Sequence, residues 1–141
     1  MYEGGGGNLP PSCLLRNYQI RKKIMAKQLI TLCVSGELSV AKRRTSARMP
    51  ASGRIIGVYA SIGTPATGAT VIIDVNISDT TIFTTQANRP TIASGAYSSV
   101  AGTAANNKFA LGDVIVVDID RVGTEIPGED LTIGIWVDFD Y

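Results

Sequence analysis

From Gln28 onward, apolar side chains alternate with polar or small ones through most of the chain. Successive side chains of a β-strand point to opposite faces of a sheet, whereas an amphipathic helix returns to the same face about every 3.6 residues. The alternation is clear over Arg54–Ile62, Val71–Ile77 and Val114–Arg121, with turn residues such as Gly63–Gly68 between the runs. This pattern predicts about eight short strands and no amphipathic helix.

Residue parity assigns a face to each side chain of a predicted strand. In Arg54–Ile62 the inner face is predicted to hold Ile56, Val58, Ala60 and Ile62. Ile55, Gly57, Tyr59 and Ser61 then point outward. In Val71–Ile77, Asp74 and Asn76 are predicted to face solvent. Between Gln28 and Val40 we predict two short strands broken at Gly36, and Lys42–Gly53 is predicted to be a loop or a sheet-edge segment.

The clearest predicted hairpin joins Val114–Arg121 to Leu131–Phe139 through the turn residues Gly123–Asp130. Strands at regular turn spacing without helices are typical of sandwiches. We therefore predict an all-β fold, an antiparallel β-sandwich that is jelly-roll-like and carries an extended N-terminal arm.

The length of 141 residues matches one domain. Residues 1–27 are predicted to form the extended arm, because Gly4–Gly7 and the pair Pro10 and Pro11 cannot supply a core. Residues 28–141 are predicted to form the sandwich. Met25 is an alternative natural start, which would make the residues before it a leader.

The chain contains no histidine, which removes Ser-His-Asp and Cys-His nucleophiles and histidine-containing zinc sites. The pairs Asp118/Asp120 and Asp138/Asp140 each put two carboxylates on one strand face, a spacing that also occurs in calcium and acid/base sites. We expect solvated sheet faces here, because strands offer too few oxygen ligands for calcium. The sequence predicts no enzyme, no cofactor and no metal, and a carboxylate hydrolase is retained as a competing hypothesis.

Charge is distributed unevenly, since residues 1–54 carry a net charge of +8 and residues 55–141 carry −7. The candidate contact residues are Lys42, Arg43, Arg44, Arg48 and Arg54. No known nucleic-acid-binding motif accompanies them, so we predict contact with an acidic protein surface and no specific nucleic acid.

Trp136 lies on the strand face opposite Leu131, Ile133 and Ile135, and is therefore predicted to lie outside the central layer of the sandwich. An outward tryptophan beside small residues is often an interface anchor, although a loop or arm of the same chain is an equal alternative. Gln86–Asn107 is a polar excursion of 22 residues, with one strand predicted near Tyr97–Val100. Its length makes it a candidate binding loop.

Cys13 and Cys33 are too few for a disulfide framework, and no apolar run reaches the length of a membrane span. Synthesis in a cytoplasm without a membrane partner is therefore predicted.

Three motifs occur in order: Gly63–Gly68, then Val71–Asn76, then Thr80–Ile92. Phe109–Asp113, Val117–Gly123 and Asp130–Ile133 follow them. Together they span about Ile55–Val137 and closely resemble a β-rich module of virion structural proteins in tailed bacteriophages. The resemblance implies a non-enzymatic module on the particle, in a capsid decoration (cement) protein, a head fibre or a tail protein.

The absence of long shaft repeats favours the decoration protein among these. Its expected partners are the major capsid protein and further copies of the chain, as a dimer or trimer. Its expected location is the capsid surface of a virion, after synthesis in the host cytoplasm. The alternative is a tail or fibre module that recognises a host-surface receptor through Trp136 and the Gln86–Asn107 loop.

Overall fold

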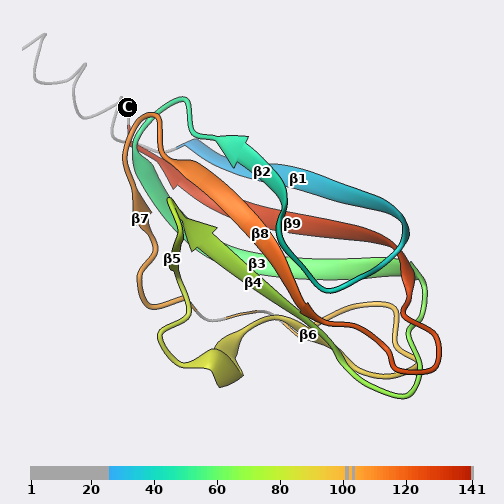
Figure 1. The fold of residues 1–141 in the computed structure, drawn as a ribbon. Helices are drawn as coiled ribbons and strands as arrows, with labels where there is room; N and C mark the ends of the chain where they lie inside the picture. The colour runs from blue at the N-terminus through green and yellow to red at the C-terminus, as the bar shows by residue number, and fades with distance from the viewer. Residues whose placement is uncertain (1–25, 101, 103, 141) are drawn as a thin grey trace, which may run out of the picture.

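The computed structural model describes residues 26–100, 102 and 104–140, and Figure 1 shows their strands and one short 3-10 helix. The strands are β1 (Ala26–Glu37), β2 (Ala41–Arg48), β3 (Gly53–Thr64), β4 (Val71–Ile77), β5 (Thr80–Thr81), β6 (Thr91–Ile92), β7 (Lys108–Phe109), β8 (Val114–Arg121) and β9 (Glu129–Phe139). The 3-10 helix η1 spans Gln86–Asn88.

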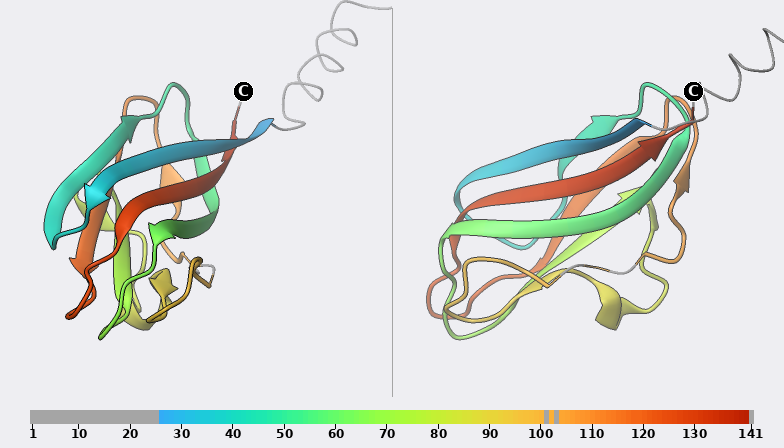
Figure 2. Two further views of the ribbon diagram at one scale, coloured as in Figure 1. Left: turned by 90° about the vertical axis from the view of Figure 1, so that its right-hand side faces the viewer. Right: turned by 180° about the vertical axis from the view of Figure 1, so that it is seen from behind.

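The strands form two antiparallel sheets packed face to face. Sheet A has the order β1-β9-β3-β7, and sheet B has the order β2-β8-β4-β5, with β6 also paired to β4. Early strands therefore pair with late ones in a nested series: β1 with β9, β2 with β8, and β3 with β7. This is the pairing of a long hairpin rolled into a jelly roll, and it confirms the predicted all-β antiparallel sandwich. Figure 2 shows β1, β9 and β3 side by side when seen from behind.

The core lies between the inner faces of the two sheets. The fully buried residues of sheet A include Val58, Ile133 and Ile135, and those of sheet B include Ile73 and Val117. At one end, the rings of Phe109 and Phe139 meet edge to face, with centroids 5.8 Å apart. These side chains are the inward half of each alternating run, so their burial is the main stabilising contribution to the fold.

The predicted β8–β9 hairpin is wrong. β8 pairs with β2 and β4 in sheet B, whereas β9 pairs with β1 and β3 in sheet A. Residues 122–128 carry the chain from one sheet to the other. Alternation shows that each strand has a core face, but two strands that face each other across a core have the same pattern as two that pair.

The predicted inner and outer faces of β3 are wrong at the start of the strand. Ile55 is buried and Ile56 is exposed, the reverse of the prediction. Ile55 pairs with Val137 and Gly57 with Trp136, so Ile56 is an extra residue in a β-bulge. The inserted residue reverses the faces, and from Val58 onward the predicted inner face is confirmed.

The region before β3 also differs from the prediction. β1 runs without interruption to Glu37, and the predicted second strand at Leu38–Val40 is absent, because these residues connect the two sheets. The segment from Lys42 is the edge strand β2, as one of the two predicted alternatives proposed. The predicted arm, residues 1–27, falls almost wholly outside the described residues and stays a prediction.

The long polar excursion lies along β3. Tyr97 accepts a hydrogen bond from the amide of Ile62, Ser99 donates to Ala60, and Gly102 donates to Val58 through main-chain groups. This segment therefore extends sheet A past β3 by isolated bridges, in place of the regular strand predicted there. Figure 2 shows the segment beside β3 in the view from behind. The excursion is thus fixed against the outer edge of sheet A.

Candidate functional site

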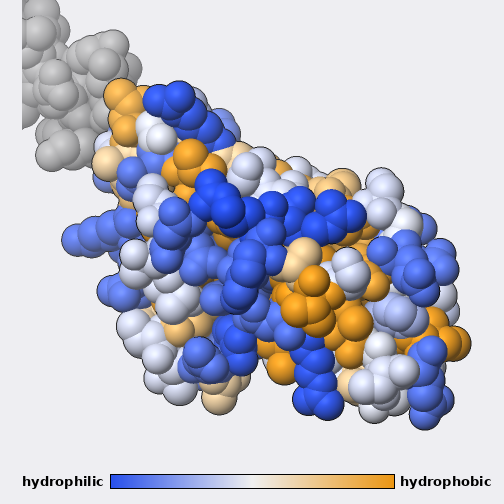
Figure 3. All heavy atoms as spheres, in the orientation of Figure 1, coloured by the Kyte–Doolittle hydropathy of each residue, from blue (hydrophilic) through white to orange (hydrophobic). Residues whose placement is uncertain are grey.

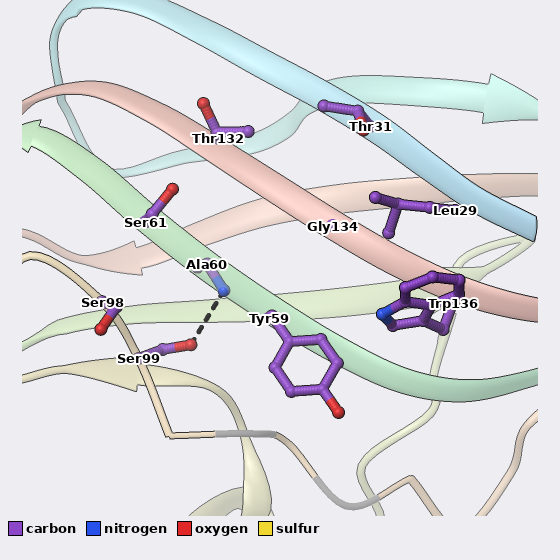
Figure 4. Close-up of a pocket in the computed structure, with 10 residues that line it drawn as sticks. All are labelled: Leu29, Thr31, Tyr59, Ala60, Ser61, Ser98, Ser99, Thr132, Gly134 and Trp136. Atoms are coloured by element: carbon purple, nitrogen blue, oxygen red, sulfur yellow. Dashed lines mark hydrogen bonds between the residues drawn. The ribbon is translucent and has the colours of Figure 1, made fainter.

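The outer face of sheet A contains a hollow of about 460 Å³, which we name the Trp136 hollow. Its lining residues come from β1, β3, β9 and the excursion beside β3: Leu29, Thr31, Tyr59, Ala60, Ser61, Ser98, Ser99, Thr132, Gly134 and Trp136. Figure 4 shows these residues on the three strands and the adjoining loop. The volume is within the range of small-molecule sites.

Two glycines shape the floor of the hollow. Gly134 lies in the middle, directly between Thr31 on β1 and Tyr59 on β3, and places no side chain of its own in the floor. A Cβ at Gly57 would lie 3.1 Å from Cε2 of Tyr59, so the Tyr59 ring lies back over Gly57. Because Gly57 pairs with Trp136, the ring of Tyr59 is next to that of Trp136, as Figure 4 shows.

Trp136 forms one end of the floor, opposite Leu29 across the β1–β9 ladder. Trp136 is 39% exposed and Tyr59 is 46% exposed, so both rings present area to solvent. The prediction that Trp136 lies outside the central layer is confirmed. Its indole lies outside the core and is partly exposed to solvent.

The wall of the hollow comes from the excursion beside β3. Ser98 bridges to Ser61, and the Ser99 hydroxyl accepts a hydrogen bond of 2.8 Å from the amide of Ala60. The structure therefore brings Trp136 and part of the Gln86–Asn107 loop to one site. Sequence parity found the outward tryptophan, but the two glycines and Tyr59 were missed, because their role depends on which strands are neighbours.

A second surface lies on the outer face of sheet B, at the base of β2. Asp118 is only 7% exposed and accepts hydrogen bonds from the main-chain amide of Arg43 at 2.7 Å and from Nδ2 of Asn76 at 3.0 Å. A β-bulge in β2 between Ala41 and Thr45, with Arg43 at a φ of 53°, directs that amide toward Asp118. The bulge therefore covers the carboxylate.

Two sequence predictions are wrong here. Asp118 and Asn76 were expected to face solvent, but both are buried. Asp120 is paired with Lys42, at 3.0 Å, and with Arg89. The hydrogen bond to Asp120 and the Asp120 charge raise the pKa of Lys42 above its ordinary value of 10.5. The face is an internally neutralised cluster in place of a solvated row of acids.

Three of the five predicted basic contact residues are engaged with the chain's own carboxylates. Lys42 pairs with Asp118 and Asp120, Arg43 pairs with Asp79, and Arg54 lies 3.8 Å from Asp138. Arg44 and Arg48 are exposed on β2 and make no ion pair within the described part of the chain. Figure 3 shows hydrophilic residues gathered over β2 and β8. The fold thus divides the predicted basic patch into a paired part and an unpaired part.

Asp74 lies beside this cluster and accepts a hydrogen bond of 2.6 Å from the Thr81 hydroxyl. Burial raises the pKa of Asp74 above its ordinary value of 3.8, the Thr81 hydrogen bond opposes this change, and the Asp120 charge adds to it. Since the folded state then holds the proton more tightly than the unfolded state, the free energy of unfolding falls as pH rises through the raised pKa.

Replacing Asp74 with Asn removes this titration and keeps an oxygen acceptor for Thr81. Asp74 lowers the free energy of unfolding of the native chain as pH rises from about 4 toward neutrality. We expect this contribution to be absent from the Asp74→Asn variant. Urea denaturation of both proteins at several pH values measures the difference. Parallel pH profiles would contradict the raised pKa.

Within residues 26–100, 102 and 104–140, no three His, Cys, Asp or Glu side chains are grouped so that they could hold a metal ion. No helix in the same residues is long and apolar enough to cross a membrane. Cys33 is a free thiol exposed on β1, and Cys13 lies outside the described residues.

No family model matches the chain, and no curated protein matches it significantly. One solved structure with a similar fold is a chain of the cyanophage Pam1 capsid asymmetric unit. The two share 13% sequence identity with a TM-score of 0.44, and the match covers 82% of this chain and 85% of that chain. A likeness at this level carries no argument about function.

Proposed function

We propose that the chain is a bacteriophage capsid decoration (cement) protein that binds the major capsid protein and stabilises the shell. The sequence resemblance over Ile55–Val137 supports a virion module. The observation that carries the docking mode is the edge strand β2, where Arg44 and Arg48 are exposed without an ion-pair partner among the described residues. An edge strand with free main-chain groups and unpaired cations suits an acidic protein surface.

This docking mode revises the predicted contact set. Lys42, Arg43 and Arg54 already neutralise carboxylates of the same chain, so an external acid would have to compete with them. Among the described residues, Arg44 and Arg48 have no such carboxylate partner. Charge at an interface rim mainly raises the association rate, and salt screens it over about 8 Å at physiological ionic strength.

Reversing both charges, Arg44→Glu with Arg48→Glu, is expected to slow binding to purified shells of the parent phage about tenfold at low salt. Co-sedimentation gives the occupancy, and stopped-flow light scattering gives the rate. The matched control is Lys108→Glu with Arg121→Glu. It changes the net charge by the same amount as the β2 variant, but on β7 and β8. Unchanged kinetics in the β2 variant, or an equal loss in the control, would remove β2 as the docking edge.

The alternative is a tail or fibre module that recognises a host-surface receptor. The Trp136 hollow favours it, because the hollow combines an exposed indole with residues of the long loop. Stoichiometric sedimentation with shells supports decoration, whereas binding to whole host cells without binding to shells supports the alternative. Sedimentation-velocity measurements test the proposed dimer or trimer in the same samples.

We also propose that the chain is not an enzyme. Asp118 and Asp120 are held in place by Lys42, Arg89, the Asn76 side chain and the main-chain amide of Arg43. A general acid needs a carboxyl that can exchange its proton with a substrate. Turnover of a polysaccharide that Asp118→Asn abolishes, in a variant that still folds, would overturn this proposal.

A further inference from the structure

We propose that the Trp136 hollow on the outer face of sheet A binds a neutral sugar, with the pyranose ring against Trp136 and Tyr59. The inference rests on the hollow alone, so it holds for a module on a capsid or on a tail. It goes beyond capsid docking, because the hollow and the β2 edge belong to different sheets.

The first argument is the shape and chemistry of the floor. Gly57 lets the Tyr59 ring lie back against the sheet, and Gly134 adds no side chain to the floor between Tyr59 and Thr31. The two exposed rings give an apolar platform on which the C–H face of a pyranose can pack. A pyranose ring, apolar on its C–H faces and polar around its rim, fits a hollow of about 460 Å³.

The second argument is the surrounding hydroxyl groups. Five of the ten lining residues are Ser or Thr. Within the described part of the chain, the side-chain hydroxyls of Thr31, Ser61 and Thr132 have no hydrogen-bond partner, and that of Ser99 accepts one bond and can still donate. Hydroxyls that both donate and accept match the rim of a sugar. Figure 4 shows Ser61, Ser99 and Thr132 on the side of the hollow away from Trp136, and Thr31 on β1 near Leu29.

The third argument is charge. All ten lining residues are uncharged. The charged side chains of this face lie toward its ends, with Lys27, Arg54 and Asp138 in one cross-strand row and Asp130 at the other end. A phosphate, a sulfated glycan or a nucleic acid would find no cation in the hollow, so a neutral ligand is favoured.

The hollow is unsuited to an extended peptide. A peptide that joins a sheet needs free main-chain groups, but β9 at the floor is already paired with β1 and β3 on both sides. Exposed Trp and Tyr rings also occur in protein interfaces, so a second copy of the chain is the competing occupant, and it becomes an outcome of the test.

The experiment uses the full chain and the fluorescence of Trp136, the only tryptophan in the sequence. The probes are neutral oligosaccharides of glucose, galactose, mannose and N-acetylglucosamine. At least one is expected to give a saturable shift in emission, because a sugar on the indole displaces water from the reporting ring. If none of these oligosaccharides gives a saturable response, the proposal is overturned.

Variants then test the location. Gly134→Val fills the floor with a side chain that strands favour, and it is expected to weaken binding at least tenfold without lowering the urea midpoint. Trp136→Ala, followed by calorimetry, is expected to lose binding to the same extent. The matched control is Tyr97→Ala, which removes an exposed aromatic ring that does not line the hollow. Equal affinity in Gly134→Val, or equal loss in Tyr97→Ala, would overturn the site.

Sedimentation velocity of the free chain distinguishes the other occupant. A dimer that dissociates in Trp136→Ala and is unaffected by sugar would assign the face to a second copy and overturn the sugar proposal. Shell binding is scored separately with the β2 variants. A chain that binds shells and no sugar therefore contradicts only this inference, and a chain that binds sugar and no shell contradicts only the decoration function.

Discussion

Replacing Gly123 with alanine is expected to lower the free energy of unfolding by about 2 to 3 kcal/mol or more. Gly123 is buried in the segment that carries the chain from β8 to β9. A Cβ there would collide with the carbonyl oxygen of Ile126 and would lie 2.6 Å from that of Thr67. Both obstacles are main-chain atoms, so no side-chain rotation relieves the overlap.

The overlap also breaks a connection between loops. Thr67, in the loop after β3, donates to the carbonyl of Ile126 at 2.9 Å and accepts from the amide of Glu125 at 3.1 Å. Moving residues 122–128 to admit a methyl group would lengthen these bonds at the point where the chain changes sheets. The Gly123→Ala variant is therefore expected to lose stability without changing the ends of the strands.

Urea denaturation followed by circular dichroism measures this loss. The matched control is Gly134→Ala, where the added Cβ would lie 3.2 Å from Cδ1 of Leu29, the end of a flexible side chain. We expect the control to match or exceed native stability by up to about 1 kcal/mol, because glycine weakens a strand interior. A Gly123→Ala protein as stable as the control would show that the two loops are not packed as described.

Replacing Asp118 with alanine is expected to cost about 2 to 4 kcal/mol. The substitution leaves the buried Asn76 amide group and the part-buried Arg43 main-chain amide without their acceptor. It also removes one of the two carboxylates near Lys42. A buried donor without a partner carries its full desolvation penalty, which is larger than the net gain of an ordinary hydrogen bond.

The control for Asp118 is Asp79→Asn, which removes another charge that contacts Arg43 and keeps a residue type that tolerates the left-handed φ of 72° at this position. The Asp79 side chain is 73% exposed, so its ion pair contributes less than about 1 kcal/mol. Thermal and urea unfolding of both variants separate a buried hydrogen-bond network from a surface charge pair. Similar losses in the two proteins would contradict the claim that the β2 bulge covers Asp118.

The sequence predicts much of the fold because the alternation within each strand shows which of its faces is buried. The inner faces of β4 and β8 follow from alternation, and the bounds of β8 agree with the predicted Val114–Arg121. The outward position of Trp136 follows from the same parity. These properties depend on neighbours two residues apart, and local sequence contains that information.

Strand partners could not be obtained in this way. β8 and β9 are consecutive and equally amphipathic, but they lie in different sheets, because each is paired on both sides by strands from elsewhere in the chain. Alternation identifies the core face of a strand but does not show which strand pairs with it. The bulge at Ile56 was missed for a similar reason, since an extra residue shows only against a partner's register.

The sequence by itself determined an all-β sandwich, the core faces of most strands, an exposed tryptophan and an uneven distribution of charge. Only the tertiary structure decided which charges neutralise one another and which residues surround that tryptophan. Asp118 is 75 residues from Arg43 in the chain, and Tyr59 is brought next to Trp136 by the β3–β9 register. Burial preference is a property of one side chain with its near neighbours, whereas a site is a property of strands that meet after folding.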